Sequence, residues 1–379
     1  MARITLGEVA REYKVALKDA SGLPVVGLEH LTSGEISLEH WDEGKETTFT
    51  KEFKKGQMLF GRRRAYLKKA ALAPFDGVCS GDIIVIEAIP GRMNPDLLPF
   101  IIQNDLLFDY AVGNSAGSLS PRVKWESLKN YTFDLPEMDK QDKIVRLLKA
   151  AHAVKKSYRK LLEATDALVK SQFIEMFGDP VSNDKNWPLL PLSACLHGID
   201  SGKSLNCEGH PRSRDLPAVL KLSAVTYGEY DPEENKELPS PEAFVPELEV
   251  HAGDLLFSRK NTREYVGMSA IVRETPKNLM LPDLIFRLMP RDCIRVEYLH
   301  QLINHTQYRP VISGLASGTA GSMPNISKQR LLALKIPLPP VDVQLAIEPI
   351  VEQSDKSKFE LKQAIQRVDN LIKSLISQE

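Results

Sequence analysis

The sequence predicts an α+β protein in which two similar mixed α/β modules are each followed by a long helix. Three observations support this prediction: a short junction sequence occurs twice, further segments repeat in the same order upstream of it, and a long stripe of apolar residues follows each copy. A chain of 379 residues is long enough for two domains, each with its own hydrophobic core.

The junction is the clearest repeat. YTFDLPEMDKQDKIVRLL (residues 131–148) and LALKIPLPPVDVQLAIEPIV (residues 332–351) both run from a short apolar strand through Leu-Pro to Asp, Gln and an amphipathic helix. Gln141 and Gln344 are 203 positions apart, as are Pro136 and Pro339. A constant offset of this kind indicates an internal duplication.

Upstream segments repeat in the same order. KKGQMLFGR (residues 54–62) matches HAGDLLFSR (251–259), SAGSLSPRV (115–123) faces TAGSMPNI (319–326), and ITLGEVA (4–10) faces LPLSACL (190–196). The sequence therefore predicts one module over residues 1–138 and a second over 179–340. Short strand patterns mixed with single helices favour an α+β fold over a doubly wound sheet.

Two long helices are predicted over residues 139–178 and 341–379. Gly178 and Pro180 end the first, because glycine accepts the left-handed position after a helix and proline cannot continue it. Apolar or small residues alternate at spacings of three and four, which is the seam of a coiled coil. The predicted seam is Ile144, Leu147, Ala151, Val154, Tyr158, Leu161 and Leu168 in the first helix, and Ile347, Ile350, Leu361, Ala364, Val368, Leu371 and Leu375 in the second.

These helices should pair with each other. Each has about 35 residues and would be about 50 Å long. A whole module lies between them in the chain, so either a parallel or an antiparallel orientation is sterically open. The antiparallel orientation is favoured, because it places the two modules at opposite ends of a rod.

The first module contains a cluster of basic residues in KEFKKGQMLFGRRRAYLKK (residues 51–69). The planar fork of arginine can grip a phosphate, or guanine O6 and N7, with two hydrogen bonds at once. These residues are candidate DNA contacts, and the alternative is a solvated basic face. The candidates are Lys54, Lys55, Arg62, Arg63, Arg64, Lys68 and Lys69, with Arg122 and Lys124 as a weaker second group.

The matching turn of the second module supplies Arg259, Lys260, Asn261 and Arg263. Asparagine can pair with adenine N6 and N7. A small, polar, glycine-rich loop over residues 316–327 could also approach a base or a phosphate, whereas an ordinary turn or loop length alone would equally explain both segments. The further candidates are Thr319, Ser322 and Asn325 in this loop, and Lys203.

Composition and missing motifs argue against several other classes. The net charge of −1 means that DNA binding would rest on local patches. No adenine-methylation, P-loop or GxSxG motif occurs, and His300 and His305 have the wrong spacing for zinc. The four cysteines (Cys79, Cys195, Cys207 and Cys293) are scattered, which is typical of reduced thiols. We expect a cytoplasmic, non-catalytic protein with no metal, no signal peptide and no membrane contact.

The duplicated arrangement resembles the specificity subunit of type I restriction–modification systems. GDLLFSRKNTREYVG (residues 253–267) and GTAGSMPNISKQRLLALKIPLPPVDVQ (318–344) are typical of that family in wording as well as in order. The modules are compact for this family, which leaves their loop boundaries open.

The resemblance implies two target-recognition domains, each recognising one half of a bipartite, asymmetric target in double-stranded DNA. It also implies an antiparallel helical spacer that docks two methyltransferase subunits, with restriction–translocase subunits joining them. S-adenosylmethionine would be held by the methyltransferase, and ATP and Mg by the restriction partner, with no cofactor bound by this chain. Two alternatives remain: a coiled-coil scaffold whose modules bind protein, and a fused DNA-modifying enzyme.

Overall fold

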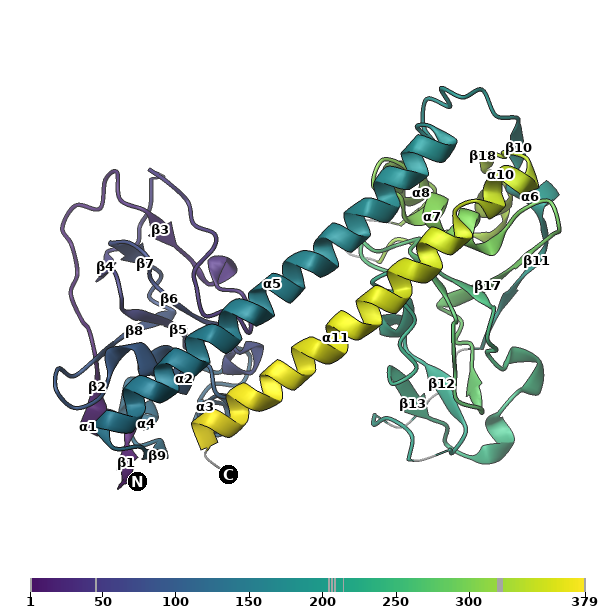
Figure 1. Cartoon of the computed structure of the whole chain (residues 1–379). Helices are drawn as coiled ribbons and strands as arrows, with labels where there is room; N and C mark the ends of the chain where they lie inside the picture. The colour runs from purple at the N-terminus through teal and green to yellow at the C-terminus, as the bar shows by residue number, and fades with distance from the viewer. Residues whose placement is uncertain are drawn as a thin grey trace. The chain divides into compact units, whose positions relative to one another are not determined.

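The computed structural model describes residues 2–44, 46–203, 205, 207, 209–213, 215–318 and 323–377 (Figure 1). The chain divides into two compact units. Met1–Lys160 and Lys362–Glu379 form the first unit, and Leu161–Leu361 forms the second. Both divisions fall inside long helices, so each unit contains one α/β module with segments of two helices. The domain boundaries expected after residues 138, 178 and 340 remain a prediction.

The first unit's module contains three sheets. β1 pairs with β9, four antiparallel strands follow the order β2-β8-β5-β6, and a third sheet has the order β3-β7-β4, with β3 parallel to β7. The strands are β1 (Ala2–Thr5), β2 (Ala10–Glu12), β3 (Val25–Val26), β4 (Lys51–Phe53), β5 (Met58–Gly61), β6 (Ala70–Leu72), β7 (Gly77–Cys79), β8 (Ile83–Ala88) and β9 (Thr132–Leu135). The helices are α1 (Leu6–Val9), α2 (Leu98–Ile102), α3 (Asp105–Gly113) and α4 (Trp125–Leu128), with short 3-10 turns η1 (Leu28–His30), η2 (Ala65–Leu67) and η3 (Pro95–Leu97).

The second unit's module repeats this plan. β10 pairs with β18, four strands follow the order β11-β17-β14-β15, and the third sheet is β13-β12-β16, with β12 parallel to β16. The strands are β10 (Leu189–Pro191), β11 (Leu196–Ser201), β12 (Ala218–Leu220), β13 (Asn235–Glu237), β14 (Leu255–Ser258), β15 (Ser269–Ile271), β16 (Leu279–Met280), β17 (Ile285–Pro290) and β18 (Lys335–Pro337). The helices are α6 (Leu192–Cys195), α7 (Val296–Asn304), α8 (Arg309–Gly314) and α9 (Lys328–Ala333), with 3-10 turns η4 (Leu222–Val225), η5 (Pro241–Ala243) and η6 (Pro246–Leu248).

The central strand of each module shows why the repeated sequence folds alike. β5 and β14 are buried along their whole length and begin two residues after Gly56 and Gly253. These glycines have φ values of 86° and 94°, a left-handed conformation that other residues rarely adopt. The predicted mixed α/β fold with two similar modules is therefore confirmed.

The repeated glutamine explains the repeated junction. In the first unit the buried side chain of Gln141 donates from Nε2 to the Pro136 carbonyl (2.8 Å), and its Oε1 accepts from the Asn94 amide (2.7 Å). Gln344 makes the same pair of bonds, to the Pro339 carbonyl (2.7 Å) and from the Arg295 amide (2.8 Å). One buried amide thus joins the end of a strand, a loop of the module and the start of a helix.

The long helices pair in opposite directions, as predicted. α5 (Met138–Phe177) ends before Gly178, whose φ is 79°, and α11 (Glu348–Ser377) runs beside it (Figure 1). In the first unit Lys155 is ion-paired with Asp369, and in the second Lys358 Nζ lies 3.0 Å from Asp166 Oδ1. From Lys155 to Asp166 the residue number rises along α5, while the number of the paired residue on α11 falls from 369 to 358. The two helices are therefore antiparallel.

The predicted seam is wrong in one of its two interleaved sets. In the set that begins with Ile144, Ile144 and Ala151 are buried and Tyr158 is partly buried. The set that begins with Leu147 is exposed to solvent. The positions one residue later are the ones that turn inward. The exposed set is Leu147, Val154, Leu161 and Leu168 on α5, with Leu371 on α11, while Leu148, Lys155, Leu162 and Val169 are buried or partly buried.

Packing on two sides explains this error. Ile144 and Leu148 belong to the first module's core, so α5 faces its module as well as α11. Such a helix buries a broader stripe than a coiled-coil seam. Neighbouring apolar pairs such as Leu147-Leu148 and Leu161-Leu162 leave the phase of that stripe ambiguous in the sequence. On α11 the predicted Ile347 is buried, and Ile350, Leu361, Ala364, Val368 and Leu375 are partly buried.

The C-terminal helical region also differs from the prediction. Residues 341–379 were expected to form one helix, but α10 (Val341–Leu345) and α11 are separated by a short turn. Pro349 lies at the second position of α11. It has no N–H to donate to residue 345, so a helix begins here more readily than it continues.

Replacing the buried junction amide should destabilise the fold. Gln141→Leu leaves the Asn94 N–H and the Pro136 carbonyl without their partner, at a cost of about 1–3 kcal/mol in the free energy of unfolding. Urea unfolding followed by circular dichroism measures this. Gln363→Leu, at an exposed position of α11, is the control and should change stability by less than about 0.5 kcal/mol. Equal effects of the two substitutions would refute the role of the junction amide.

Candidate nucleic-acid interface

The basic turn of the first unit packs against the loop predicted to accompany it. The turn follows β5 and contains Arg62, Arg63 and Arg64. The Val123 amide donates to the Arg62 carbonyl (3.0 Å), and the Arg64 amide donates to the Pro121 carbonyl (2.8 Å). The structure therefore brings two segments that are about sixty residues apart in sequence into one surface.

The second unit builds the same surface from the matching residues. The Ile326 amide donates to the Arg259 carbonyl (2.8 Å), and the Asn261 amide donates to the Pro324 carbonyl (3.3 Å). Reciprocal backbone hydrogen bonds close the loop in both units, between Ala116 and Arg122 in the first and between Ser317 and Asn325 in the second. The duplication thus extends to individual backbone hydrogen bonds.

An aspartate organises the arginines of the first unit. Arg122 Nε lies 2.7 Å from Asp82 Oδ1, and Arg63 Nη1 lies 3.5 Å from Asp82 Oδ2. Ser120 Oγ accepts from Arg63 Nε and Nη2, at 3.3 and 3.2 Å. The Arg122 hydrogen bond and the charge of both arginines lower the pKa of Asp82, so its carboxylate stays ionised. Both guanidinium groups are thereby held in place on an accessible surface.

Several other predicted cations of the first unit are engaged by neighbours. Lys54 is ion-paired with Glu52 and Asp76, Lys68 Nζ lies 2.7 Å from Asp105 Oδ1, and Lys69 Nζ donates to the Leu28 carbonyl (2.8 Å). The exposed members of the predicted set are Lys54, Lys55, Arg64, Arg122 and Lys124. The predicted cluster is thus a mixture of exposed cations and cations tied to the module.

Arg259 is the best-supported candidate of the second unit. Its guanidinium lies over the Phe286 ring, 5.0 Å from the centroid, and Nε donates to Asn325 Oδ1 (3.1 Å). Asn261 is buried, and its Nδ2 donates to Thr226 Oγ1 (3.1 Å) and Ser258 Oγ (3.4 Å). The Asn261 amide therefore stabilises the turn in this structure rather than offering a free edge to a base.

The remaining candidates of the second unit are placed less closely. Lys260 forms an isolated backbone β-bridge with Asn325, and Arg263 is exposed nearby. Lys203 is exposed and forms an isolated β-bridge with Pro282. Thr319 and Ser322 lie outside the described residues.

Sequence reasoning missed Asp82 and Ser120 as functional candidates. Asp82 directly precedes β8, which pairs with β5, and the Arg62 amide donates to the Asp82 carbonyl (2.9 Å). The pairing of β5 with β8 could have suggested this proximity, but only a correct strand register would have placed Asp82 beside the arginines. Ser120 was a loop residue with no distinguishing pattern of its own.

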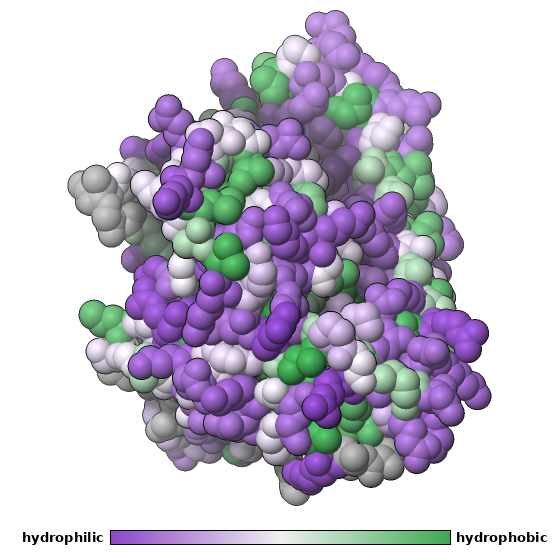
Figure 2. All heavy atoms as spheres, turned by 90° about the vertical axis from the view of Figure 1, so that its left-hand side faces the viewer, coloured by the Kyte–Doolittle hydropathy of each residue, from purple (hydrophilic) through white to green (hydrophobic). Residues whose placement is uncertain are grey.

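The face of the molecule shown in Figure 2 is mainly polar. Figure 2 shows one face of the molecule, on which hydrophilic side chains predominate and hydrophobic ones form small, separate patches. Among the described residues no group of three His, Cys, Asp or Glu side chains could hold a metal ion. Within the same ranges no helix is long and apolar enough to span a membrane.

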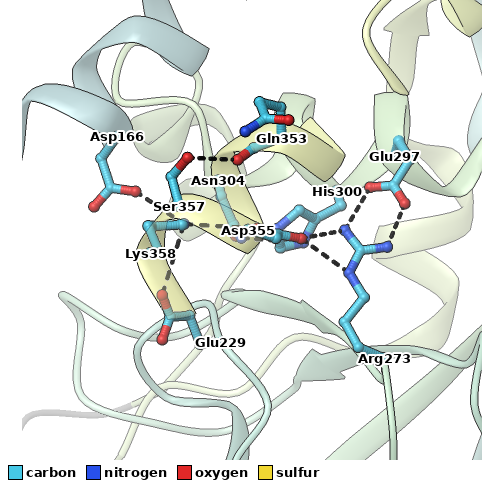
Figure 3. Close-up of polar contacts among 10 residues, drawn as sticks. All are labelled: Asp166, Glu229, Arg273, Glu297, His300, Asn304, Gln353, Asp355, Ser357 and Lys358. Atoms are coloured by element: carbon cyan, nitrogen blue, oxygen red, sulfur yellow. Dashed lines mark hydrogen bonds and ion pairs between the residues drawn. The ribbon is translucent and has the colours of Figure 1, made fainter. Parts of the chain in front are cut away.

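A polar joint fixes the second module to its helix segments (Figure 3). Arg273 makes two bonds to Glu297 of α7, at 2.5 and 3.0 Å, and its Nη2 lies 2.8 Å from Asp355 of α11. Lys358 faces three carboxylates, at distances of 3.0 to 3.8 Å. These carboxylates are Asp166, Glu229 and Asp355.

The joint surrounds a cavity of about 170 Å³. His300 lines this cavity, and its Nδ1 lies within hydrogen-bond distance of Ser269 Oγ (3.1 Å) and Asn304 Nδ2 (3.3 Å). Burial, together with the Arg273 and Lys358 cations, lowers the pKa of His300 to about 3. His300 is therefore neutral at physiological pH.

Comparisons with known proteins agree with this architecture. The family model described as "Type I restriction modification DNA specificity domain" matches residues 5–163. The chain is 33% identical over 196 residues to the EcoEI specificity subunit of Escherichia coli, a match covering 49% of this chain and 33% of that protein. It is 23% identical over 327 residues to the MjaVIII specificity subunit of Methanocaldococcus jannaschii, covering 78% of this chain and 73% of that one. The matches to EcoEI and EcoKI span well under half of those proteins.

Solved structures share the fold. The type I restriction–modification S subunit from M. genitalium superposes with a TM-score of 0.53 at 12% identity, covering 99% of this chain and 95% of that one. A chain from a type I system studied for complex assembly and conformational transition gives 0.50 at 19% identity, with 99% and 96% coverage.

Two modules of one plan, each joined to a segment of an antiparallel helix pair, define the class as a duplicated mixed α/β protein. Residues 5–163 match the type I restriction modification DNA specificity domain, the chain is similar in sequence to curated type I specificity subunits, and it shares the fold of a solved S subunit.

Acidification should weaken the second unit through His300. Its folded-state pKa lies below the value of about 6.5 for an unfolded histidine, so this stability is present above pH 6.5 and is lost as pH falls toward 3. At pH 5 the loss should be about 2 kcal/mol relative to pH 7. Urea unfolding at both pH values should show a smaller loss for His300→Gln than for the unsubstituted protein. His197→Gln, at an exposed position in the same unit, is the control, and equal losses in all three proteins would exclude His300.

Proposed function

We propose that this chain is the DNA sequence-specificity subunit of a type I restriction–modification complex. Each unit would recognise one half of a bipartite target in double-stranded DNA. The two halves would differ in sequence, because the two surfaces carry different side chains.

The paired surfaces are the observation that carries this proposal. In both units a turn after the central strand is hydrogen-bonded to a polar loop, and the turn presents arginine at the same position, Arg62 or Arg259. Cations at such a surface suit phosphate contacts, while the adjoining loop can approach base edges. Phosphate contacts would make the affinity dependent on salt.

A second surface suits the docking of methyltransferase subunits. The exposed set Leu147, Val154, Leu161 and Leu168 recurs every seven residues on α5, with exposure between 42% and 55%. Ala150, Ser157, Ala164 and Ser171 are exposed between them at three- and four-residue spacing. We call these eight residues the outer stripe. Large residues alternating with small ones can accept a partner helix at close approach, and we assign the stripe to a helix of the methyltransferase.

The chain would contribute position rather than chemistry. S-adenosylmethionine would be bound by the methyltransferase subunits, two per complex by analogy with the two units, and ATP and Mg by the restriction subunits. Such a complex would act on DNA in the cytoplasm.

Co-expression with a type I methyltransferase subunit from the same genome tests the proposal, with long-read mapping of methylated adenines as the readout. A two-part asymmetric motif with a constant gap is the expected result. A stable complex that leaves DNA unmodified would contradict DNA recognition. Failure to form any complex would favour the scaffold alternative, in which the modules bind other proteins.

Neutralising the first unit's turn should weaken DNA binding without preventing assembly. Arg62→Gln, Arg63→Gln and Arg64→Gln together remove three cations, so the affinity of the methyltransferase complex for its target should fall about tenfold or more, with a shallower salt dependence. Fluorescence anisotropy at several salt concentrations measures both. The matched control replaces Lys14, Lys18 and Lys140, three exposed lysines of the same unit, by Gln and should keep the affinity. Unchanged DNA affinity of the triple variant would exclude this recognition surface.

Charge on the outer stripe should prevent assembly while leaving the fold intact. Leu161→Glu with Leu168→Glu places two carboxylates where an apolar helix would dock, so co-purification of the methyltransferase should be lost. Glu163→Lys, a charge reversal at an exposed position of α5 a quarter turn or more from Leu161, Ala164 and Leu168, is the control and should assemble normally. Normal assembly of the double variant would show that the methyltransferase docks elsewhere.

A further inference from the structure

Each of the two loops carries an exposed apolar side chain among its described residues. Leu119 is 92% exposed, and Met323 is 45% exposed. Leu119 and Met323 occupy the same position of the sequence repeat, because SAGSLSPRV (residues 115–123) aligns with TAGSMPNI (319–326). Single exposed apolar residues are common on proteins and need no explanation alone. The same position in both copies, on the surface assigned to DNA, does need one.

The loop that carries Leu119 is held firmly on both sides. Two reciprocal hydrogen bonds of 3.0 and 2.9 Å join Ala116 to Arg122 at its base. Ser120, next to Leu119, accepts two hydrogen bonds from Arg63, and Arg122 is tied to Asp82. The arginines are therefore placed beside an apolar residue that projects into solvent.

The second unit offers the same arrangement with other residues. Met323 directly precedes Pro324, whose carbonyl accepts from the Asn261 amide (3.3 Å). Asn325, two positions after Met323, accepts a hydrogen bond at Oδ1 from Arg259 Nε (3.1 Å). Its backbone forms two reciprocal hydrogen bonds of 2.9 Å with the backbone of Ser317. The apolar residue again lies within two residues of a side chain bonded to the arginine of the turn.

The chemistry of these side chains excludes phosphate as their ligand. Neither carries a donor or a charge for a phosphate oxygen, whereas the surrounding arginines do. On DNA, apolar side chains contact the thymine methyl group in the major groove or insert between base pairs, and Leu and Met are among the residues that do so. Burial of their exposed surface against the bases would be favourable.

We propose that Leu119 and Met323 make apolar contacts with the bases, one in each half of the target, and are specificity-determining residues. The neighbouring arginines hold the backbone phosphates and so deliver each apolar side chain into the groove. This inference rests on the proposed function and assigns the residues through which the loops contact bases.

The test uses the methyltransferase complex and the methylated motif of the unsubstituted protein. Leu119→Ser should relax the base preference in one half of the motif, and Met323→Ser should relax it in the other half. Affinity for a duplex carrying the motif should fall about tenfold in each variant, whereas affinity for a scrambled duplex and the salt dependence should not change. Leu119→Met and Met323→Leu keep an apolar side chain and should restore the motif.

Controls separate this inference from general effects of surface substitution. Val15→Ser and Val181→Ser remove exposed apolar residues of the first and second units outside these loops, and both should keep the full motif and affinity. Substituting deoxyuridine for thymidine in the duplex separates the two kinds of base contact, because loss of affinity with the unsubstituted protein would identify a thymine methyl. Retained affinity would identify insertion between bases.

Two results would overturn the inference in different ways. An unchanged motif and affinity in both serine variants, with the unsubstituted complex still showing a two-part motif, would refute the roles of Leu119 and Met323 alone. If the unsubstituted complex methylates no two-part motif, the proposed function fails, and this inference fails with it.

Discussion

The buried amides of Gln141 and Gln344 are the constraint on which the rest of each unit depends. Each donates to a proline carbonyl shortly before a helix, Pro136 or Pro339, and accepts from a backbone amide of a module loop, Asn94 or Arg295. Because both partners are backbone groups in a buried place, an apolar substitute could not satisfy them. Strand, loop and helix are therefore fixed together at one point in each unit.

Ion pairs extend this attachment along the helix segments. In the first unit Lys149 pairs with Asp96, and Lys156 with Glu39. In the second, Arg295 pairs with Glu348, and Arg273 with Asp355. Exposed pairs of this kind contribute little stability individually. These ion pairs instead fix where each module contacts its helix, since each pair joins a module to a particular helical turn.

Duplication preserves the backbone and changes the surface. Arg62 and Arg259 occupy equivalent turns and make equivalent backbone bonds, yet their surroundings differ. The arginines beside the first turn are held by Asp82, whereas Arg259 lies over Phe286 and bonds to Asn325. A shared scaffold with unlike side chains is what the proposed recognition of two unlike half-sites would require, and an identical pair of subunits could not provide it.

The sequence alone determined the two-module plan, the long helices and the segments that form each surface, because these depend on repeats, proline and glycine positions and local apolar spacing. It did not determine which apolar residues of α5 turn inward. Leu147 and Leu148 are equally apolar, and only packing against both α11 and the module selects Leu148. The tertiary structure also decided that Asn261 is buried and that Asp82 lies between Arg63 and Arg122. Those relationships join residues distant in sequence, so no local pattern encodes them.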